Sequence, residues 1–186
     1  MILPVYVYGS PILRKVAAEI DKDYPGLEQF INDLTETMYF TDGVGLAAPQ
    51  VGKSIKVLSI DATPFKDDDP SLEDFKRVMI NPKIIVRTGD ETPFNEGCIS
   101  IPGIRENVLR PTRIKVTYFD PEFNFKEETI EGIAARIVQH ECDHLEGVLF
   151  IDHISMMRKK LLKRKLTDIS KGDVDVDYKI VFPVKK

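Results

Sequence analysis

The chain has 186 residues, of which 42% are hydrophobic, so we expect a single domain with a sizeable core over residues 1–186. The formal net charge of −4 excludes the overall basic character of a nucleic-acid-binding protein, and the two cysteines exclude a disulfide framework. No apolar run reaches 18 residues and the start lacks a signal-peptide pattern, so we expect a cytoplasmic protein without a membrane span.

The first part of the chain predicts an extended arm and one amphipathic helix. Residues 1–22 predict the arm, with a short turn at Gly9-Ser10-Pro11. We expect the helix to begin near Pro25, because the fixed φ of proline suits the first helical position, and to end in a turn before Gly43. The residues on its apolar face recur at helical spacing and are Leu27, Phe30, Ile31, Leu34 and Met38.

The middle of the chain predicts strands joined by turns. Residues 43–52 contain small residues and glycines, and by themselves they predict a tight turn before a strand at 55–60. The acidic segment 61–75 is broken by prolines and predicts a loop. The next strand, 78–86, contains Asn81-Pro82, so we expect it to lie at a sheet edge or to bend.

The third quarter predicts a strand pair followed by a buried helix. We expect the strands at 113–119 and 125–130 to pair with each other. Apolar residues within 129–138 recur at helical spacing, so a helix is predicted from there to near Gly147. A short apolar strand is expected at 148–151.

The last part of the chain predicts a basic helix and a tail. Ser155 is a suitable N-cap for a helix over about 155–167. Cations from Arg158 to Lys165 cover most of this helix. An acidic linker at 173–177 then leads to a predicted strand at 178–184. The residues expected on the apolar side of the helix are Met156, Met157, Leu161, Leu162 and Leu166.

The predicted buried helix carries the pattern His-Glu-x-x-His at residues 140–144. Residues four apart share one helix face, so His140 and His144 can reach one metal ion, and Glu141 can take a proton from water bound to that metal. A chance meeting of two surface histidines is the alternative, but two of the three histidines in the chain lie here. We therefore expect an α+β fold in which short, mostly antiparallel strands surround a central metal-binding helix, with a further helix near the C-terminus.

The third metal ligand distinguishes the possible enzymes. A metzincin needs a histidine where Phe150 stands. A thermolysin-like enzyme takes a later glutamate, but none follows Glu146. His153 lies beyond the helix, and Cys142 points about 200° away from the first histidine, as expected of a core thiol. Cys98 remains as the other soft ligand.

Three segments together resemble the motifs of peptide deformylases. Residues Glu96-Gly97-Cys98-Ile99-Ser100 resemble the Glu-Gly-Cys-Leu-Ser motif of that family, and Gln139 to Gly147 resembles its His-Glu-x-Asp-His segment. Residues 43–50 are similar to its Gly-φ-Gly-φ-Ala-Ala-x-Gln motif. The order and spacing also match, over about the first 155 residues. The departures are Ile99 in place of leucine, and Pro49.

This resemblance implies a metal-dependent hydrolase that removes the N-formyl group from the N-terminal formyl-methionine of new polypeptides. It implies that Fe(2+) is held by Cys98, His140 and His144, although zinc, nickel or cobalt would suit the same ligands. Glu141 is expected to be the general base. The expected donors to the oxyanion are the Gln50 side-chain amide and the backbone N–H of Ile99.

The resemblance also assigns residues around the metal. The methionine pocket is expected to be lined by Val44, Phe94, Ile133 and Ile137. The peptide backbone beyond the methionine is expected to be held by Gly45 and Arg105. The residues expected to orient the metal ligands are Glu96, Asp143 and Arg110, of which the last two are expected to pair. Each of these three could equally belong to a surface salt bridge.

Formyl-methionyl nascent peptides are the expected partners, with no membrane and no DNA. The basic helix could contact the ribosome, as in some bacterial family members, or could simply be a solvated face. Two other functions compete with a deformylase, namely a zinc endopeptidase of the His-Glu-x-x-His type and a non-catalytic metal-binding module. The presence of both Glu141 and Gln50 argues against the module, because neither is needed simply to hold a metal ion.

Overall fold

A computed structural model describes residues 1–183, and in this range a five-stranded antiparallel sheet in the order β2-β3-β4-β5-β6 dominates the fold. The strands are β1 (Val5–Tyr6), β2 (Gly45–Ala47), β3 (Val57–Asp61), β4 (Lys76–Cys98), β5 (Ile101–Phe119), β6 (Phe125–Glu131) and β7 (Ile180–Val181). The α-helices are α1 (Leu27–Phe40), α2 (Gly132–Leu145) and α3 (Met156–Ser170). The 3-10 helices are η1 (Pro11–Arg14), η2 (Ala48–Val51), η3 (Thr63–Phe65), η4 (Pro70–Leu72) and η5 (Phe150–His153).

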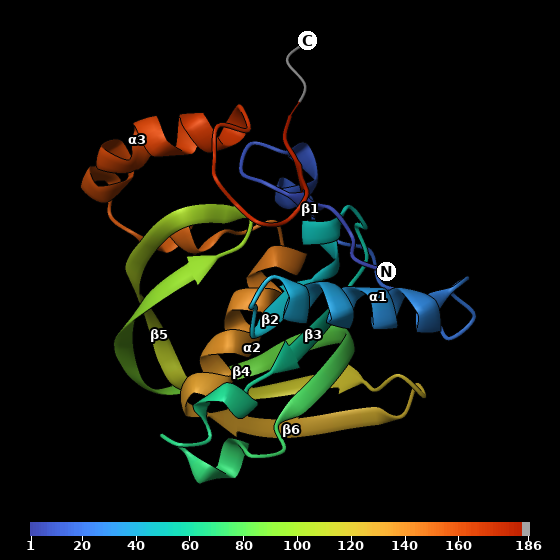
Figure 1. The fold of residues 1–186 in the computed structure, drawn as a ribbon. Coiled ribbons are helices and arrows are strands. Elements are labelled where there is room, and N and C mark those ends of the chain that lie inside the picture. The colour runs from blue at the N-terminus through green and yellow to red at the C-terminus, as the bar shows by residue number, and fades with distance from the viewer. Residues whose placement is uncertain (184–186) are drawn as a thin grey trace.

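Helix α2 lies at the centre of the molecule, with the curved β4 and β5 on one side of it and α1 on the other (Figure 1). Its apolar residues pack in one buried cluster with residues of β3, β4 and β5. The buried members from α2 include Ala134, Val138 and Leu145. The α+β fold with a mostly antiparallel sheet around a central helix is therefore confirmed.

Strands β4 and β5 are much longer than the short strands that the sequence predicts, because the expected segments at 78–86 and 113–119 are each only part of a longer continuous strand. The expected bend at Asn81-Pro82 is confirmed. Asn81 has a φ of 50°, and the register with β5 shifts between Ile80 and Lys83. Pairing with β3 stops at Ile80, and the proline lies at the irregular step of the pairing with β5, where the ladder of backbone hydrogen bonds is interrupted.

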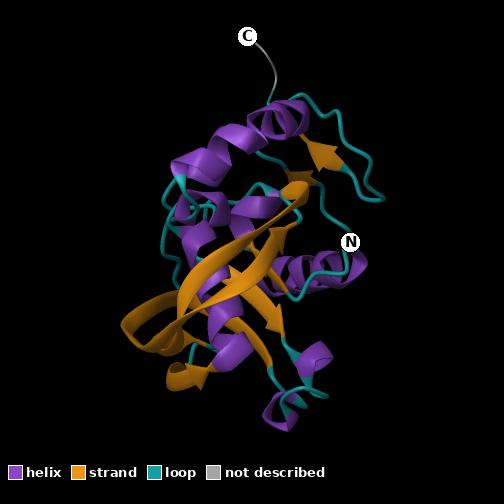
Figure 2. Ribbon diagram, turned by 90° about the vertical axis from the view of Figure 1, so that its left-hand side faces the viewer, coloured by secondary structure: helices purple, strands orange, loops and turns teal. Residues whose placement is uncertain are grey.

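A small second sheet joins two segments that are far apart in the sequence. β1 and β7 pair in parallel, with Val5 opposite Ile180 and Tyr6 opposite Val181. Figure 2 shows these two strands beneath α3, near the end of the main sheet where β4 turns into β5. The predicted strand at 178–184 is thus shorter than expected, and residue 184 lies outside the described residues.

Helix α1 buries the five residues expected on its apolar face. The strand at 125–130, its pairing with the preceding strand, and the strand near 55–60 are also confirmed. The acidic segment 61–75 is not an irregular loop throughout, because it contains η3 and η4. Among residues 1–183, no helix combines the length and the apolar character that crossing a bilayer requires.

Two predictions near the C-terminus are wrong. Residues 148–151 do not form a strand but lead into the 3-10 helix η5. On α3, the residues that face the protein are Leu162, Leu166 and Ile169. Met156, Met157 and Leu161 are exposed instead, because the helix contacts the protein along a narrower stripe than its apolar residues cover.

Candidate active site

The predicted metal ligands come together from two elements of the core. His140 and His144 lie one turn apart on α2, and their ring centroids are 5.1 Å apart. Cys98 is the last residue of β4, and its Sγ lies 3.3 Å from Nε2 of His144. The three ligand atoms lie within 4.8 Å of one another, as a group that could hold a metal ion.

The chemistry of these three side chains fits a metal ion. In a tetrahedral site, a sulfur and a nitrogen ligand lie roughly 3.5 Å apart, close to the separation of Cys98 and His144. Burial opposes ionisation of the Cys98 thiol, but the charge of His144 and hydrogen bonds with both imidazoles lower its pKa to about 5. The ligand form, the thiolate, is therefore favoured at neutral pH.

Glu96 fixes the orientation of the His140 ring. The distance from His140 Nδ1 to Oε2 of Glu96 is 3.0 Å. A carboxylate only accepts hydrogen bonds, so Nδ1 carries the proton and Nε2 is the nitrogen left for a metal. Burial opposes ionisation of Glu96, but hydrogen bonds from His140 and Arg110 hold its pKa well below the ordinary range.

A buried ionic network supports Glu96. Arg110 donates to both carboxylate oxygens of Glu96, at 2.7 and 3.0 Å, and to Asp143 at 2.8 Å. The expected pair of Arg110 and Asp143 is thus present, and it is not a surface pair, because the Arg110 side chain is only 5% exposed. Neutralisation by guanidinium groups on several sides lets the carboxylates remain charged inside the protein.

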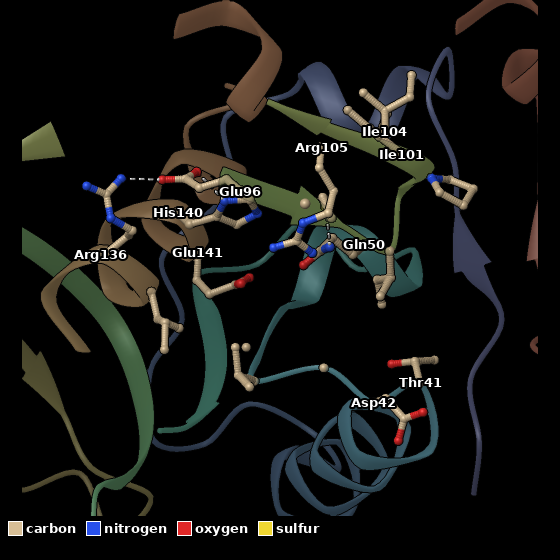
Figure 3. Close-up of a pocket in the computed structure, with 18 of the residues that line it drawn as sticks. Thr41, Asp42, Gln50, Glu96, Ile101, Ile104, Arg105, Arg136, His140 and Glu141 are labelled. Carbon is tan, nitrogen blue, oxygen red and sulfur yellow. Dashed lines mark hydrogen bonds and ion pairs between the residues drawn. The ribbon is translucent and has the colours of Figure 1, made fainter. Parts of the chain in front are cut away.

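Sequence analysis missed two members of this network. Arg136, one turn before His140, donates to Glu96 at 2.8 Å and to the carbonyl oxygens of Thr92 and Val108. Figure 3 shows the interaction of Arg136 with Glu96. His153, whose ring Nε2 lies 2.8 Å from Asp143, belongs to η5 and follows the segment that was expected to form a strand. Arginine within an apolar helical repeat was the available signal for Arg136, since buried arginine needs a carboxylate partner.

Glu141 points into the open space beside His140 (Figure 3). Its side chain is buried, and Oε2 has no hydrogen-bond partner among the described residues. Burial raises the pKa of Glu141, an effect that the charges of His140 and His144 partly oppose. A carboxylate with a free oxygen and a raised pKa is suited to accepting and releasing a proton.

Gly45 is needed because Glu141 approaches its backbone closely. A Cβ atom at position 45 would lie 2.5 Å from Oε1 of Glu141. Gly45 therefore lets the candidate base pack closely against the backbone. Positive φ is not the reason for either glycine, because neither Gly43 nor Gly45 has one. Gly45 also lines the cavity, so its expected role in peptide binding stays a prediction.

Gln50 links the residues after β2 to the cysteine turn. Its Oε1 accepts a hydrogen bond from the backbone N–H of Ala47 at 2.8 Å, which fixes the orientation of the amide. Its Nε2 lies 3.4 Å from Cys98 Sγ and 3.3 Å from Ser100 Oγ. The donor end of the amide therefore points to the candidate metal site.

These groups border a cavity of about 580 Å³. The expected pocket residues and backbone contacts all line it, namely Val44, Gly45, Phe94, Ile99, Arg105, Ile133 and Ile137. Arg136 lies over the ring of Phe94, 5.4 Å from its centroid, and so supports this wall. Arg105 donates to the Asn95 side chain at 3.0 Å and lies over Gly97, beside the cavity.

The turn between β4 and β5 has a further contact that sequence analysis missed. The hydroxyl of Tyr178 donates to the carbonyl oxygen of Ile99 at 2.8 Å, and Tyr178 lines the same cavity. Burial, together with the nearby Cys98 charge, raises the pKa of Tyr178 to about 12, so the hydroxyl keeps its proton.

Cys142 faces away from the cluster, as its helical position predicts. Its side chain is buried in the core cluster on the far side of α2, and it borders a different cavity. Burial, followed by the charge of Asp143, raises the pKa of this thiol to about 12. The two cysteines therefore occupy opposite electrostatic environments.

Comparisons with known proteins agree on one family. The family model described as "Polypeptide deformylase" matches residues 2–160. A peptide deformylase of Christiangramia forsetii is 50% identical over 100% of this chain and 98% of its own. The crystal structure of the peptide deformylase from Thermus thermophilus matches with a TM-score of 0.82 and 33% identity, over 93% of this chain and 100% of that chain. A peptide deformylase structure from Legionella pneumophila matches with a TM-score of 0.81 and 35% identity, over 93% and 98% of the two chains.

Proposed function

The chain belongs to the polypeptide deformylase family, hydrolases that remove the N-formyl group from new polypeptides, and we propose how its own residues carry out this reaction. The observation that carries the proposal is the convergence of Cys98, His140 and His144, together with the position of Glu141 beside His140 (Figure 3). We assign the first three residues as ligands of Fe(2+), a metal that a thiolate and two imidazoles can bind. Such an ion supplies Lewis acidity, which makes water an effective nucleophile near neutral pH.

Glu141 accepts one proton from the attacking water and passes it to the departing amine nitrogen, so that formate and a free amino terminus are released. Its unpartnered Oε2 supports this role. As the formyl carbonyl oxygen becomes negatively charged, the Nε2 group of Gln50 and the backbone N–H of Ile99 donate to it. The Gln50 amide is already held in the required orientation by Ala47.

The methionine side chain of the substrate occupies the apolar part of the cavity. The residues assigned to this pocket are Val44, Phe94, Ile133 and Ile137. The unbranched, flexible methionine fills such a slot well. Gly45 and Arg105 lie beside the path of the following peptide backbone. Glu96 holds the His140 ring by its hydrogen bond to Nδ1. Arg110 in turn holds Glu96, and Asp143 pairs with Arg110.

An assay on two substrates distinguishes this function from an endopeptidase. The metal-loaded protein should release formate from a formyl-methionyl peptide and leave internal peptide bonds intact. Cleavage of an N-blocked peptide at an internal bond, without formate release, would show that the endopeptidase alternative holds. Absence of both activities in a protein of full metal content would favour the metal-binding module.

We predict that the iron form is fast and sensitive to air. Because the Cys98 thiolate donates electron density, it makes Fe(2+) easier to oxidise, and the sulfur itself is open to oxidants. Nickel or cobalt in the same ligands should give comparable rates that persist in air, since the reaction needs a Lewis acid and no redox change. Zinc should give a stable but slower enzyme.

One preparation, stripped and reloaded anaerobically with each metal, provides the measurement. Formate release is followed before and after exposure to air, with the metal content of each sample measured in parallel. Equal air stability of the iron and nickel forms, or a zinc form that is the fastest, would contradict the assignment of Fe(2+).

We also propose that α3 places the enzyme on the ribosome in the cytoplasm, where formylated nascent chains emerge. Its cations face solvent beside three exposed apolar residues, which suits a surface made of phosphates and protein. Two of them already have acidic partners, because Arg158 pairs with Glu106 at 2.6 Å and Lys159 lies 3.9 Å from Asp152. The buried face of α3 packs with residues of β5 in one cluster, which supports a single domain.

Replacing four α3 cations with glutamine should abolish co-sedimentation with ribosomes and leave hydrolysis of a free formyl-methionyl peptide unchanged. The four are Lys159, Lys160, Lys163 and Arg164. Binding of the unchanged protein should weaken steeply as salt rises. A control variant removes four exposed lysines elsewhere, namely Lys15, Lys22, Lys66 and Lys83. If both variants co-sediment like the wild type, the basic helix is only a solvated surface.

A further inference from the structure

The segment after α3 is not a free linker but approaches the cysteine turn. From residue 173 to 180 its residues alternate between exposed and half-buried. The half-buried members are Val174, Val176, Tyr178 and Ile180, and the exposed members are Asp173, Asp175, Asp177 and Lys179. Val174 and Ile180 pack against the second core cluster, so Tyr178 lies between two anchored positions.

Backbone hydrogen bonds fix where Tyr178 lies. The N–H of Val5 donates to the carbonyl oxygen of Lys179 at 2.8 Å, and the N–H of Val7 donates to that of Val181 at 3.0 Å. Tyr178 lies two residues before β7, and its hydroxyl donates to the carbonyl oxygen of Ile99. The position of the phenol is therefore set by the sheet of β1 and β7.

The turn at Ile99 and Ser100 is held from three directions. Tyr178 donates to the carbonyl of Ile99, the N–H of Tyr8 donates to the carbonyl of Ser100 at 2.8 Å, and Nε2 of Gln50 lies 3.3 Å from Ser100 Oγ. Of these three contacts, only that of Tyr178 comes from a residue that follows α3 in the sequence. The Ile99 carbonyl and the Ile99 N–H flank the same Cα atom, so fixing one limits rotation of the other.

We propose that Tyr178 is a positioning residue, which holds the Ile99 carbonyl so that the Ile99 N–H points to the formyl oxygen, and which closes one side of the substrate cavity. This inference rests on the proposed function, because it concerns a donor in the deformylation reaction. A donor that is already oriented stabilises developing charge without reorganisation at the moment of reaction. Tyr178 lies outside the segments that carry the three family motifs, so none of them assigns it a role.

The test compares Tyr178→Phe with Tyr6→Phe in the metal-loaded protein. Tyr6 lies on β1 of the same small sheet, and its hydroxyl makes no hydrogen bond to the part of the chain that the structure describes. Tyr178→Phe removes only the hydroxyl and should lower kcat about 3- to 10-fold, in line with loss of one ordinary hydrogen bond. KM for a formyl-methionyl tripeptide, metal content and Tm should stay near the wild-type values, and Tyr6→Phe should change none of these.

A second measurement does not depend on activity. Amide hydrogen exchange of the turn at residues 98–101 should be faster in Tyr178→Phe than in Tyr6→Phe, because one restraint on the turn is lost. Equal exchange in the two variants, or an unchanged kcat, would overturn the inference. An inactive wild type of full metal content would instead count against the proposed function, and the exchange comparison would still decide whether Tyr178 holds the turn.

Discussion

Glu141→Gln should retain a near-normal metal content and lose about 10² to 10⁴ of its turnover, as expected when a general base is removed. Glutamine has nearly the same shape as glutamate but cannot accept a proton from water at neutral pH. The substitution also leaves Cys98, His140 and His144 in place. The measurement is the rate of formate release from a formyl-methionyl peptide, with metal content determined on the same sample.

Glu146→Gln is the matched control for that substitution. Glu146 follows the last turn of α2 and forms a partly exposed pair with Lys56 at 3.0 Å, and neither residue lines the cavity beside the candidate metal site. Surface pairs of this kind contribute little to stability, so this variant should keep wild-type turnover. Near-wild-type turnover in metal-loaded Glu141→Gln would mean that another group moves the proton.

Cys98→Ala should lose bound metal and, with it, activity down to background, whereas Cys142→Ala should keep both. Cys98 offers a thiolate to the cluster, while burial keeps the Cys142 thiol neutral on the far side of α2. Cys142→Ala removes a buried sulfur and should cost about 1 kcal/mol of unfolding free energy through the small cavity that it leaves.

Metal content per chain after reloading, measured beside Tm and formate release, separates these two variants. Thermal unfolding shows whether Cys98→Ala still folds, so that loss of metal is not mistaken for loss of structure. Retention of metal by Cys98→Ala together with its loss in Cys142→Ala would reverse the assignment of the third ligand.

The two histidines of the site were predicted from a short sequence pattern, because helix geometry alone decides which residues share a face. The spacing of His140 and His144 places both rings on one face of any helix, and the apolar repeat of α1 selects the face that it buries. Cys98 needed more than spacing. Elimination of other ligands and the resemblance to a family identified it, because no local rule brings the end of β4 to the middle of α2.

The contacts that Arg136 and His153 make with distant residues were not predicted from the sequence. Arg136 has an ordinary helical position, and its role depends on Glu96 of β4. His153 likewise contacts Asp143 from a distant position. It belongs to the 3-10 helix η5, whereas the apolar run at 148–151 predicted a strand. The opposite error concerns three apolar residues of α3 that were expected to be buried but are exposed, namely Met156, Met157 and Leu161. An apolar residue on a helix is buried only where another element packs against it.

The parallel pairing of β1 with β7 determines the order in which the enzyme can be completed during its synthesis. Val5 precedes every residue of the metal site in the chain, yet its partner in the sheet, Ile180, follows all of them. The helix that carries both histidines has been synthesised before that partner exists. Contacts across so long a separation also form slowly, because a large loop must close before they contribute. All residues of the metal site are therefore synthesised before Tyr178, which adds its restraint to the turn at Ile99 last.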